Sequence, residues 1–349
     1  LLRRTEFVDR PHRVAELLEL ADIDAAVANI LAVDPAPPSV IFTAPADRDW
    51  ERGRDLTHFW LDRMARDSTR PFQERMAFFW HGHFCSEFGK VGSSMLMREQ
   101  IDLWRREGLG NIRSLATTMS RQVAMIRYLD NNQNKKSSPN QNFARELMEL
   151  FLLGVGNYTE ADVEASTAAW TGHSDQWDDE VAPYRWRPEW HDWSPKDFLG
   201  RRINTDADPA AWPSHGPETI AVMLGDGVVP SGADNVVNRG RSTRAVAAEF
   251  LSRKLWVSFA TDAPTPPGVM AAMRDALLAA EFDVRPWVTA MLTHPDFYTD
   301  AVRRGLVRTP VEFVVALLAA TGKRSREADT TWLMEAMGQQ LLYPPNVSG

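Results

Sequence analysis

Apolar residues recur every three or four positions along most of the chain, which is the spacing of an amphipathic helix. The clearest example lies between residues 111 and 129, where one stripe is formed by Ile112, Leu115, Ala116, Met119, Val123, Ile126 and Leu129. The same period returns in segments that begin at Pro217, Thr243, Pro267, Asp283, Val311 and Thr330. The pattern predicts a mainly α protein, a single multi-helix globular domain over residues 1–349.

Helix boundary signals are strongest in the middle of the chain. Residues 138–141, Ser-Pro-Asn-Gln, resemble a capping box with Pro at the first helical position, so we expect a helix to begin there. Gly154 and Gly156 are expected to end it, and Thr159 with Asp162 three residues later is expected to start the next helix. The segment is therefore predicted to form a helical hairpin.

The first helix of this hairpin carries charges in apolar surroundings. With 100° per residue, apolar side chains cover nearly its whole circumference, except for a sector of roughly 100° that holds Arg145, Glu146 and Glu149. A helix of this kind is mostly buried. Its carboxylates are therefore expected to face a partner, a metal or a cleft.

Glu146 and Glu149 have two interpretations. Neighbouring carboxylates in a poorly solvated site differ in proton affinity, so that one acts as an acid while the other stays ionised. Alternatively, Arg145 forms an ordinary ion pair with Glu149 at four-residue spacing, within a structural polar network. Either network would be completed by Asn140, Asn142 and Asp162.

The segment Trp80-His81-Gly82-His83 provides a second group of ionisable side chains. The two imidazoles diverge by about 200° on a helix, unless Gly82 loosens it, whereas His83 and Glu87 are predicted to share a face. His81, His83 and Glu87 are candidate ligands for a divalent metal, joined by an acid of the 140–154 helix. Proton transfer and plain hydrogen bonding inside the core are the alternatives.

Helical periodicity is absent from residues 173–213, which we expect to form an irregular insertion or a small β-ribbon. Five indoles crowd into it: Trp177, Trp186, Trp190, Trp193 and Trp212. The ionisable residues here are His173, Asp175, His191 and Asp192. Exposed indoles stack on sugar faces or ring ligands, but clustered indoles can equally form a satellite core.

Composition excludes several classes of protein. The 39 basic residues are outnumbered by 47 acidic ones, giving a net charge of −8, and this argues against nucleic-acid binding. No apolar run approaches the roughly 18 residues that a membrane span needs. The single cysteine, Cys85, rules out intrachain disulfides and is expected to be a small buried side chain. Phosphate-loop, dinucleotide-turn and nucleophile-elbow motifs do not occur.

Five blocks carry a family resemblance. The longest spans residues 140–172, and its matching positions are Asn140, Asn142, Arg145, Glu146, Leu147, Glu149, Leu150, Leu153, Gly154, Tyr158, Asp162, Val163, Thr171 and Gly172. The others are LLRR at Leu1, FWHGHF at Phe79, HDWSPKDFLG at His191 and GQQLLYPPNVSG at Gly338. Together they resemble the bacterial domain of unknown function family 1800. Gln141 replaces the family's usual Glu, so no acid–base role is carried to it.

The resemblance implies kinship without an agreed activity, and an extracytoplasmic location, periplasmic or secreted, because many relatives look exported. The chain starts without Met and stops inside a family motif, so it reads as a fragment truncated at its C-terminal end. One hypothesis is an envelope-associated, hydrolase-like enzyme with a His/Glu cleft, in which His83, Glu146 and Glu149 are catalytic and the substrate is a polymer such as a glycan.

The other hypothesis is a non-catalytic scaffold or binding protein that docks a protein partner through the Trp-rich insertion. In either case, ligand contacts are expected from Asn140, Asn142, Arg145, Asp162, His191, Asp192 and Trp193. Whether the protein is an enzyme stays open at this point.

Overall fold

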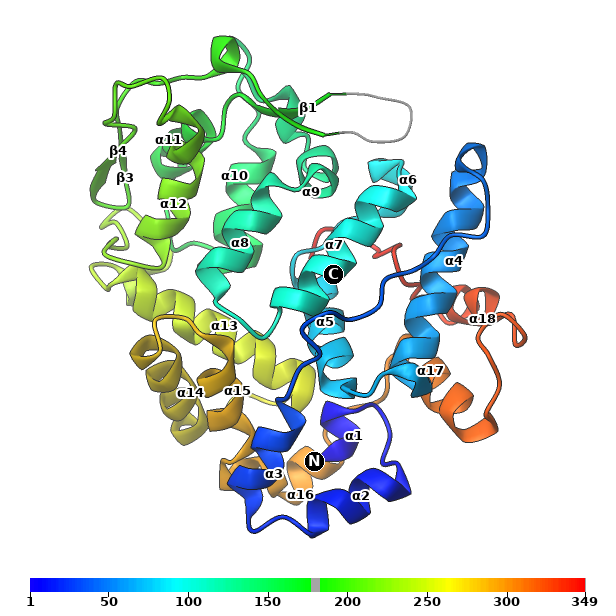
Figure 1. Ribbon diagram of the computed structural model, residues 1–349. Coiled ribbons are helices and arrows are strands. Elements are labelled where there is room, and N and C mark those ends of the chain that lie inside the picture. The colour runs from blue at the N-terminus through cyan, green and yellow to red at the C-terminus, as the bar shows by residue number, and fades with distance from the viewer. Residues whose placement is uncertain (177–182, 349) are drawn as a thin grey trace. The chain divides into compact units, whose positions relative to one another are not determined.

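A computed structural model describes residues 1–176 and 183–348, and over these the protein is mainly α, as predicted (Figure 1). The chain groups into two compact units, the first made of residues 1–111 and 252–347 and the second of residues 112–251. Helix α13 (Thr243–Phe259) runs from the second unit into the first. That the whole chain is one domain stays a prediction, and Trp177 lies outside the described residues.

Over the part of the chain that the structure describes, every regular element of the first unit is a helix. Its N-terminal part contains α1 (Leu2–Thr5), α2 (Pro11–Leu18), α3 (Ile23–Ile30), η1 (Ala46–Arg48), α4 (Asp49–Asp62), η2 (Arg63–Asp67), α5 (Pro71–His83), α6 (Phe88–Val91) and α7 (Ser94–Glu107). Its C-terminal part contains α14 (Pro267–Ala279), α15 (Val284–Leu292), η8 (Pro295–Tyr298), α16 (Asp300–Arg303), α17 (Pro310–Thr321) and α18 (Thr330–Ala336). Among the described residues of this unit, five fully buried indoles lie in the core, those of Trp60, Trp80, Trp104, Trp256 and Trp287.

Local capping explains where several of these helices begin and end. Asp22 and Ser93 accept backbone N–H groups at the starts of α3 and α7. Thr309 and Glu312 form a reciprocal capping box at the start of α17. That helix ends at Gly322, whose left-handed backbone (φ 68°) suits a residue without a Cβ atom.

A buried ion network joins α4, η2, α5 and α7. The Glu74 carboxylate, 1% exposed, accepts hydrogen bonds from the Trp60 indole (3.1 Å), the Arg63 Nε (3.3 Å) and two nitrogens of Arg105 (2.9 and 3.0 Å). The side chain of Arg105 is fully buried, and its charge is compensated mainly by Glu74, with the Asp102 carboxylate at 3.3 Å as a second partner.

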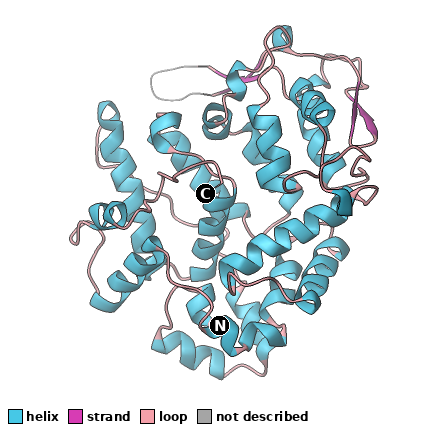
Figure 2. Ribbon diagram, turned by 180° about the vertical axis from the view of Figure 1, so that it is seen from behind, coloured by secondary structure: helices cyan, strands magenta, loops and turns pink. Residues whose placement is uncertain are grey.

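The second unit combines short helices with two strand pairs, shown in magenta in Figure 2. Its helices are α8 (Ile112–Arg121), α9 (Val123–Tyr128), η3 (Asn131–Gln133), α10 (Asn142–Glu146), η4 (Leu147–Leu152), α11 (Glu160–Ala169), η5 (Pro188–Trp190), η6 (Trp212–Ser214), α12 (His215–Met223) and η7 (Val236–Asn238). The strands β1 (His173–Asp175) and β2 (Tyr184–Trp186) pair antiparallel, as do β3 (Lys196–Phe198) and β4 (Arg201–Ile203). The expected β-ribbon is thus present within residues 173–213.

The apolar stripe between residues 112 and 129 is buried along its whole length, which confirms the core face that periodicity predicts. The single continuous helix expected there is wrong. Gln122 has extended backbone (φ −67°, ψ 135°) and separates α8 from α9. The apolar spacing from Met119 to Val123 is still four residues, so the periodicity does not reveal the break.

The capping box expected at residues 138–141 is also wrong. Lys135 and Ser138 form an antiparallel bridge, and α10 begins only at Asn142. The Asn140 side chain accepts the Asn142 amide (3.0 Å), which is an Asx turn, so the polar side chain orders a loop where a helix start was expected.

The end of this segment agrees with the prediction. The chain leaves the helical conformation at Gly154 (φ 85°) and Gly156 (φ 75°), where a Cβ atom would be strained. Thr159 and Asp162 form the expected capping box at the start of α11. Between residues 147 and 152, however, the helix widens into a π-helix, a rare form that is often found at functional sites.

Candidate functional site

The acidic pair predicted from the helical hairpin lies at this π-helical segment. Glu149 accepts a hydrogen bond of 2.6 Å from the hydroxyl of Tyr158, whose pKa is raised by burial and by that carboxylate. Glu146 is half-buried, and its pKa is raised by burial and then by the charge of Glu149. The two carboxyl groups therefore lie in unlike environments.

The ion pair expected between Arg145 and Glu149 is not formed. Arg145 instead makes a bidentate pair with Glu160, two contacts of 2.8 Å, and a contact of 3.2 Å with Gln141. The π-helix changes the angular positions that a regular 100° step assigns beyond residue 146. Glu149 consequently faces Tyr158, which follows the helix end.

The predicted metal ligands of the first unit have other roles. His81 lies within α5, where its Nε2 accepts the Leu342 amide (3.3 Å) and burial lowers its pKa to about 4. His83, two residues on, stacks on Phe79. Glu87 follows the end of α5 and caps α6 by accepting the amides of residues 89 and 90, so it does not share a helical face with His83.

These residues belong to the first unit, whereas Glu146 and Glu149 belong to the second. Among residues 1–176 and 183–348, no group of three or more His, Cys, Asp or Glu side chains is arranged to hold a metal ion. The structure therefore does not assemble the metal site from the ligands that the sequence suggested. Cys85 is fully buried, as expected.

Three buried histidines of the second unit form a cluster with indoles. His191 Nε2 lies 3.0 Å from His215 Nδ1, and His173 Nδ1 lies 2.9 Å from the Tyr184 hydroxyl. The Trp186 ring lies 5.0 Å from the rings of both His173 and His191. Burial lowers the pKa of all three, that of His191 to about 4. All three rings are therefore neutral near pH 7.

The hydrogen bonds of Thr171 fix the protonation of this His pair. Its hydroxyl donates to the Ala168 carbonyl (2.6 Å), so both the hydroxyl and the carbonyl of Thr171 can only accept from His191 Nδ1 (3.1 and 2.9 Å). His191 Nε2 then accepts from His215 Nδ1. The remaining nitrogen of the pair, His215 Nε2, is buried.

The remaining predicted binding residues divide into two groups. Asp192 lines a pocket of about 330 Å³, together with Lys136, Pro139, Gln141, Glu164, Thr167, Ala168, Thr171 and Lys196. Trp193 is 51% exposed and stacks parallel to Trp212 at 6.2 Å. By contrast, Asn142 donates to the Leu129 carbonyl (3.3 Å) and Asp162 accepts the Leu199 amide (2.8 Å), which are structural roles.

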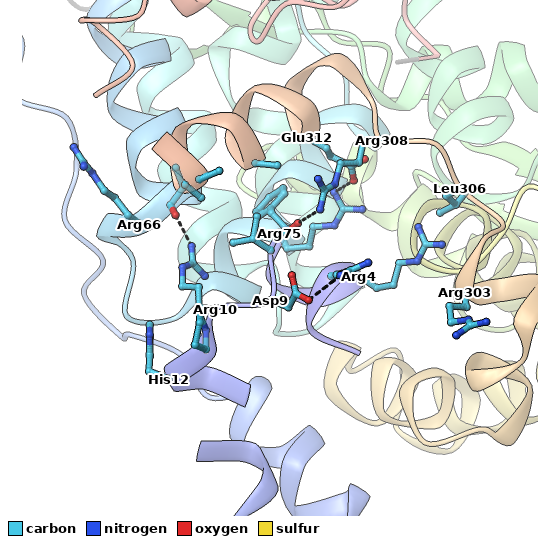
Figure 3. A pocket seen from close by; sticks show the side chains of 18 residues that line it. Arg4, Asp9, Arg10, His12, Arg66, Arg75, Arg303, Leu306, Arg308 and Glu312 are labelled. Carbon is cyan, nitrogen blue, oxygen red and sulfur yellow. Dashed lines mark hydrogen bonds and ion pairs between the residues drawn. The ribbon is translucent and has the colours of Figure 1, made fainter. Parts of the chain in front are cut away.

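A larger pocket of about 820 Å³ lies in the first unit, and seven of the 18 residues that line it are arginines (Figure 3). Its seven arginines are Arg3, Arg4, Arg10, Arg66, Arg75, Arg303 and Arg308, and its two carboxylates are Asp9 and Glu312. The arginines come from α1, α5, α16, η2 and the loops after α1 and α16. A surplus of positive charge thus gathers in a chain whose net charge is −8.

Backbone carbonyls hold many of these guanidinium groups. Arg4 donates to Val302 (2.6 Å), Arg10 to Met64 and Ala65 (3.1 and 2.6 Å), and a further bond of 3.4 Å joins Arg308 to the carbonyl of Phe7. A carbonyl orients a guanidinium but does not neutralise its charge. Carboxylates pair with four of the seven arginines besides Arg75: Asp9 with Arg3 (3.0 Å), Asp300 with Arg303 (2.9 Å), Asp67 with Arg66 (3.6 Å) and Glu6 with Arg10 (3.8 Å).

The electrostatics of the pocket reflect this surplus. Burial, followed by the charges of Arg75 and Arg308, lowers the pKa of Arg4, although Glu312 opposes the shift. Arg75 is 6% exposed, pairs with Glu312, and lies over the rings of Phe7 and Phe259 at 5.1 and 5.0 Å. Like charges therefore face one another in a partly desolvated space, which favours an anion between them.

The family described as protein of unknown function, DUF1800, matches residues 1–349. The chain belongs to the DUF1800 family. No curated protein and no solved structure is significantly similar to it. Within the described residues, no helix is both long and apolar enough to cross a bilayer.

The arginine pocket was not found from the sequence, although part of its signal was present. The first block that resembles the DUF1800 family, LLRR, supplies Arg3 and Arg4. The other five arginines are scattered between residues 10 and 308 and have no common spacing. Only the tertiary structure brings them together.

Proposed function

We propose that this DUF1800 protein binds an anionic ligand in the arginine-lined pocket of its first unit. The observation that carries the proposal is the combination of seven arginines and two carboxylates around one space of about 820 Å³. A pocket of this volume suits a small molecule. Its charge suits an oxyanion that carries two or more negative charges.

Guanidinium chemistry narrows the ligand class. A planar guanidinium binds phosphate or carboxylate oxygens through two parallel N–H groups, and its charge persists at any physiological pH. Because several guanidiniums are already oriented by backbone carbonyls, little conformational entropy is lost when an anion binds. A phosphate or a di- or tricarboxylate is the chemistry that the pocket would recognise.

Calorimetric titration with inorganic phosphate and pyrophosphate tests the proposal. We expect pyrophosphate to bind more tightly than phosphate, because its greater charge meets more guanidiniums. Both affinities should fall as KCl is raised from 20 to about 500 mM, which shortens the Debye length. Choline is the matched cation control, and binding of choline comparable to that of pyrophosphate would refute the assignment.

A hydrolase-like activity in the second unit is the second candidate. The observation that favours it is the unlike environment of Glu146 and Glu149, since carboxyls whose proton affinities differ are the usual acid–base pair of glycan hydrolysis. An extracytoplasmic location would suit such an enzyme and rests on the family resemblance. A scaffold that docks a partner through Trp193 and its neighbours is the non-catalytic counterpart of this proposal.

Thermal melts of Glu146→Gln and Glu149→Gln test this second candidate. We expect Glu146→Gln to melt within about 1 °C of wild type or slightly above it, because the substitution removes an unfavourable half-buried charge. Glu149→Gln should lower the free energy of unfolding by roughly 1 to 2 kcal/mol, because it removes the charged acceptor of the hydrogen bond from Tyr158.

Glu164→Gln, on an exposed position of α11, is the matched control and should leave the melting temperature unchanged. If Glu146→Gln melted several degrees below this control, the Glu146 carboxylate would be a structural group. The hydrolase-like candidate would then lose its basis.

A further inference from the structure

A second pocket of about 660 Å³ adjoins the arginine pocket in the first unit. The two share four lining residues, Arg3, Arg4, Asp9 and Arg303. Beyond this shared boundary the second pocket is mainly apolar, and its apolar side chains are Leu1, Leu2, Val14, Leu17, Leu18, Leu20, Ile23, Ala26, Phe297, Tyr298 and Val302. The arginine pocket and this mainly apolar pocket therefore adjoin each other.

The apolar pocket is open to water in this structure. Leu18 is 80% exposed, Tyr298 45%, Ile23 39% and Val14 37%. Single exposed apolar residues are ordinary, but a group that lines one concave surface is typical of a ligand or partner site.

We propose that the joined pockets bind a single-chain amphiphile with an anionic head, of the alkyl phosphate or fatty acid type. The head lies among the arginines, and the chain lies between α2, α3 and η8. The proposal rests on the anion-binding function proposed above and specifies its ligand class. A buried protein segment is a less suitable occupant, because the apolar pocket leads to a surplus of arginines that only an anionic group would neutralise.

The energetics give a measurable expectation. Full burial of one methylene contributes about 0.8 kcal/mol, which corresponds to roughly a fourfold gain in affinity. In an open groove we expect about half of this free energy, or roughly a twofold gain per methylene. Octyl phosphate should therefore bind on the order of tenfold more tightly than butyl phosphate.

The test is a calorimetric titration with inorganic phosphate and with butyl, hexyl and octyl phosphate, all below their micellar concentrations. Leu18→Ser, at an 80% exposed position, should weaken the binding of octyl phosphate several-fold and leave the affinity for inorganic phosphate unchanged. Ile41→Ser, 88% exposed and lining neither pocket, is the matched control and should change neither affinity.

The possible failures are distinguishable. If all alkyl phosphates bound no more tightly than inorganic phosphate, the amphiphile proposal would be overturned while anion binding stood. If neutral octyl glucoside bound as tightly as octyl phosphate, the site would not be one for an anionic amphiphile. The same would follow if Leu18→Ser and Ile41→Ser had equal affinities for octyl phosphate. If inorganic phosphate and pyrophosphate also failed to bind, the proposed anion-binding function would be refuted as well.

Discussion

Glu74→Ala is expected to destabilise the first unit by about 3 to 5 kcal/mol, the cost of removing one partner from a buried ion network. The substitution leaves the fully buried Arg105 without its main counter-charge. It also removes the acceptor of the Trp60 indole and a contact of Arg63. A loss of this magnitude is a large fraction of the roughly 5 to 15 kcal/mol by which native proteins are stable.

Urea unfolding followed by tryptophan fluorescence would measure this loss. Glu107→Ala is the control, because Glu107 is exposed at the end of α7 and its loss should change the free energy of unfolding by less than about 0.5 kcal/mol. A loss below about 1 kcal/mol for Glu74→Ala would show that water or a rearranged partner compensates the two arginines.

Acidification from pH 7 to 4.5 is expected to remove roughly 5 kcal/mol of stability through His81 and His191. Burial lowers the pKa of each to about 4, whereas the unfolded value is near 6.5. Above pH 6.5 both imidazoles are mostly neutral in the folded and in the unfolded chain, so the free energy of unfolding changes little with pH there. Between pH 6.5 and 4 only the unfolded chain binds the proton, so each group costs about 1.4 kcal/mol per pH unit.

Other ionisable groups also affect how the free energy of unfolding changes with pH. His173 and His215, whose pKa values are also lowered, add to the loss. The raised pKa values of Glu99 and Glu146 oppose it, because the folded state then takes up protons first. Aspartates with lowered pKa values, such as Asp192, lose their contribution only at lower pH, near and below 4.

Urea titrations at half-unit steps between pH 7 and 4.5 would measure the slope. His191→Gln should reduce it by about 1.4 kcal/mol per pH unit between pH 6 and 4.5, whatever its effect on stability at pH 7. Ile41→Ser, which changes an exposed side chain without an ionisable group, is the control and should leave the slope unchanged. Equal slopes in wild type and His191→Gln would mean that His191 titrates alike in both states.

Periodicity predicts the helical class and the buried faces of this chain because burial imposes that period directly on the sequence. The stripe ending at Leu129 is an example, as every one of its members is buried. The break at Gln122 and the Asx turn at Asn140 depend on single backbone conformations. Such conformations leave no periodic signal, so they could not be predicted in this way.

The candidate sites were predictable only where they are local in sequence. The acidic pair Glu146 and Glu149 was found, but the Tyr158 hydroxyl that binds Glu149 was not, because it lies beyond a π-helix and a turn. The Glu160 partner of the neighbouring Arg145 was missed for the same reason. The indole-rich segment was also recognised from composition, although His215, which orders its His pair, lies outside that segment. The arginine pocket draws on positions up to about 300 residues apart, and no sequence spacing encodes it.

The most direct test of the anion-binding claim is the affinity of pyrophosphate for matched arginine variants. Arg303 and Arg308 line the pocket, whereas Arg304, which follows α16, is exposed and does not line it. Isothermal titration should show that Arg303→Gln with Arg308→Gln weakens binding by about tenfold or more, since charged hydrogen bonds contribute about 1.5 to 3 kcal/mol. Arg304→Gln should change it by less than about twofold. Equal affinities in wild type, the double variant and the Arg304→Gln control would contradict the account.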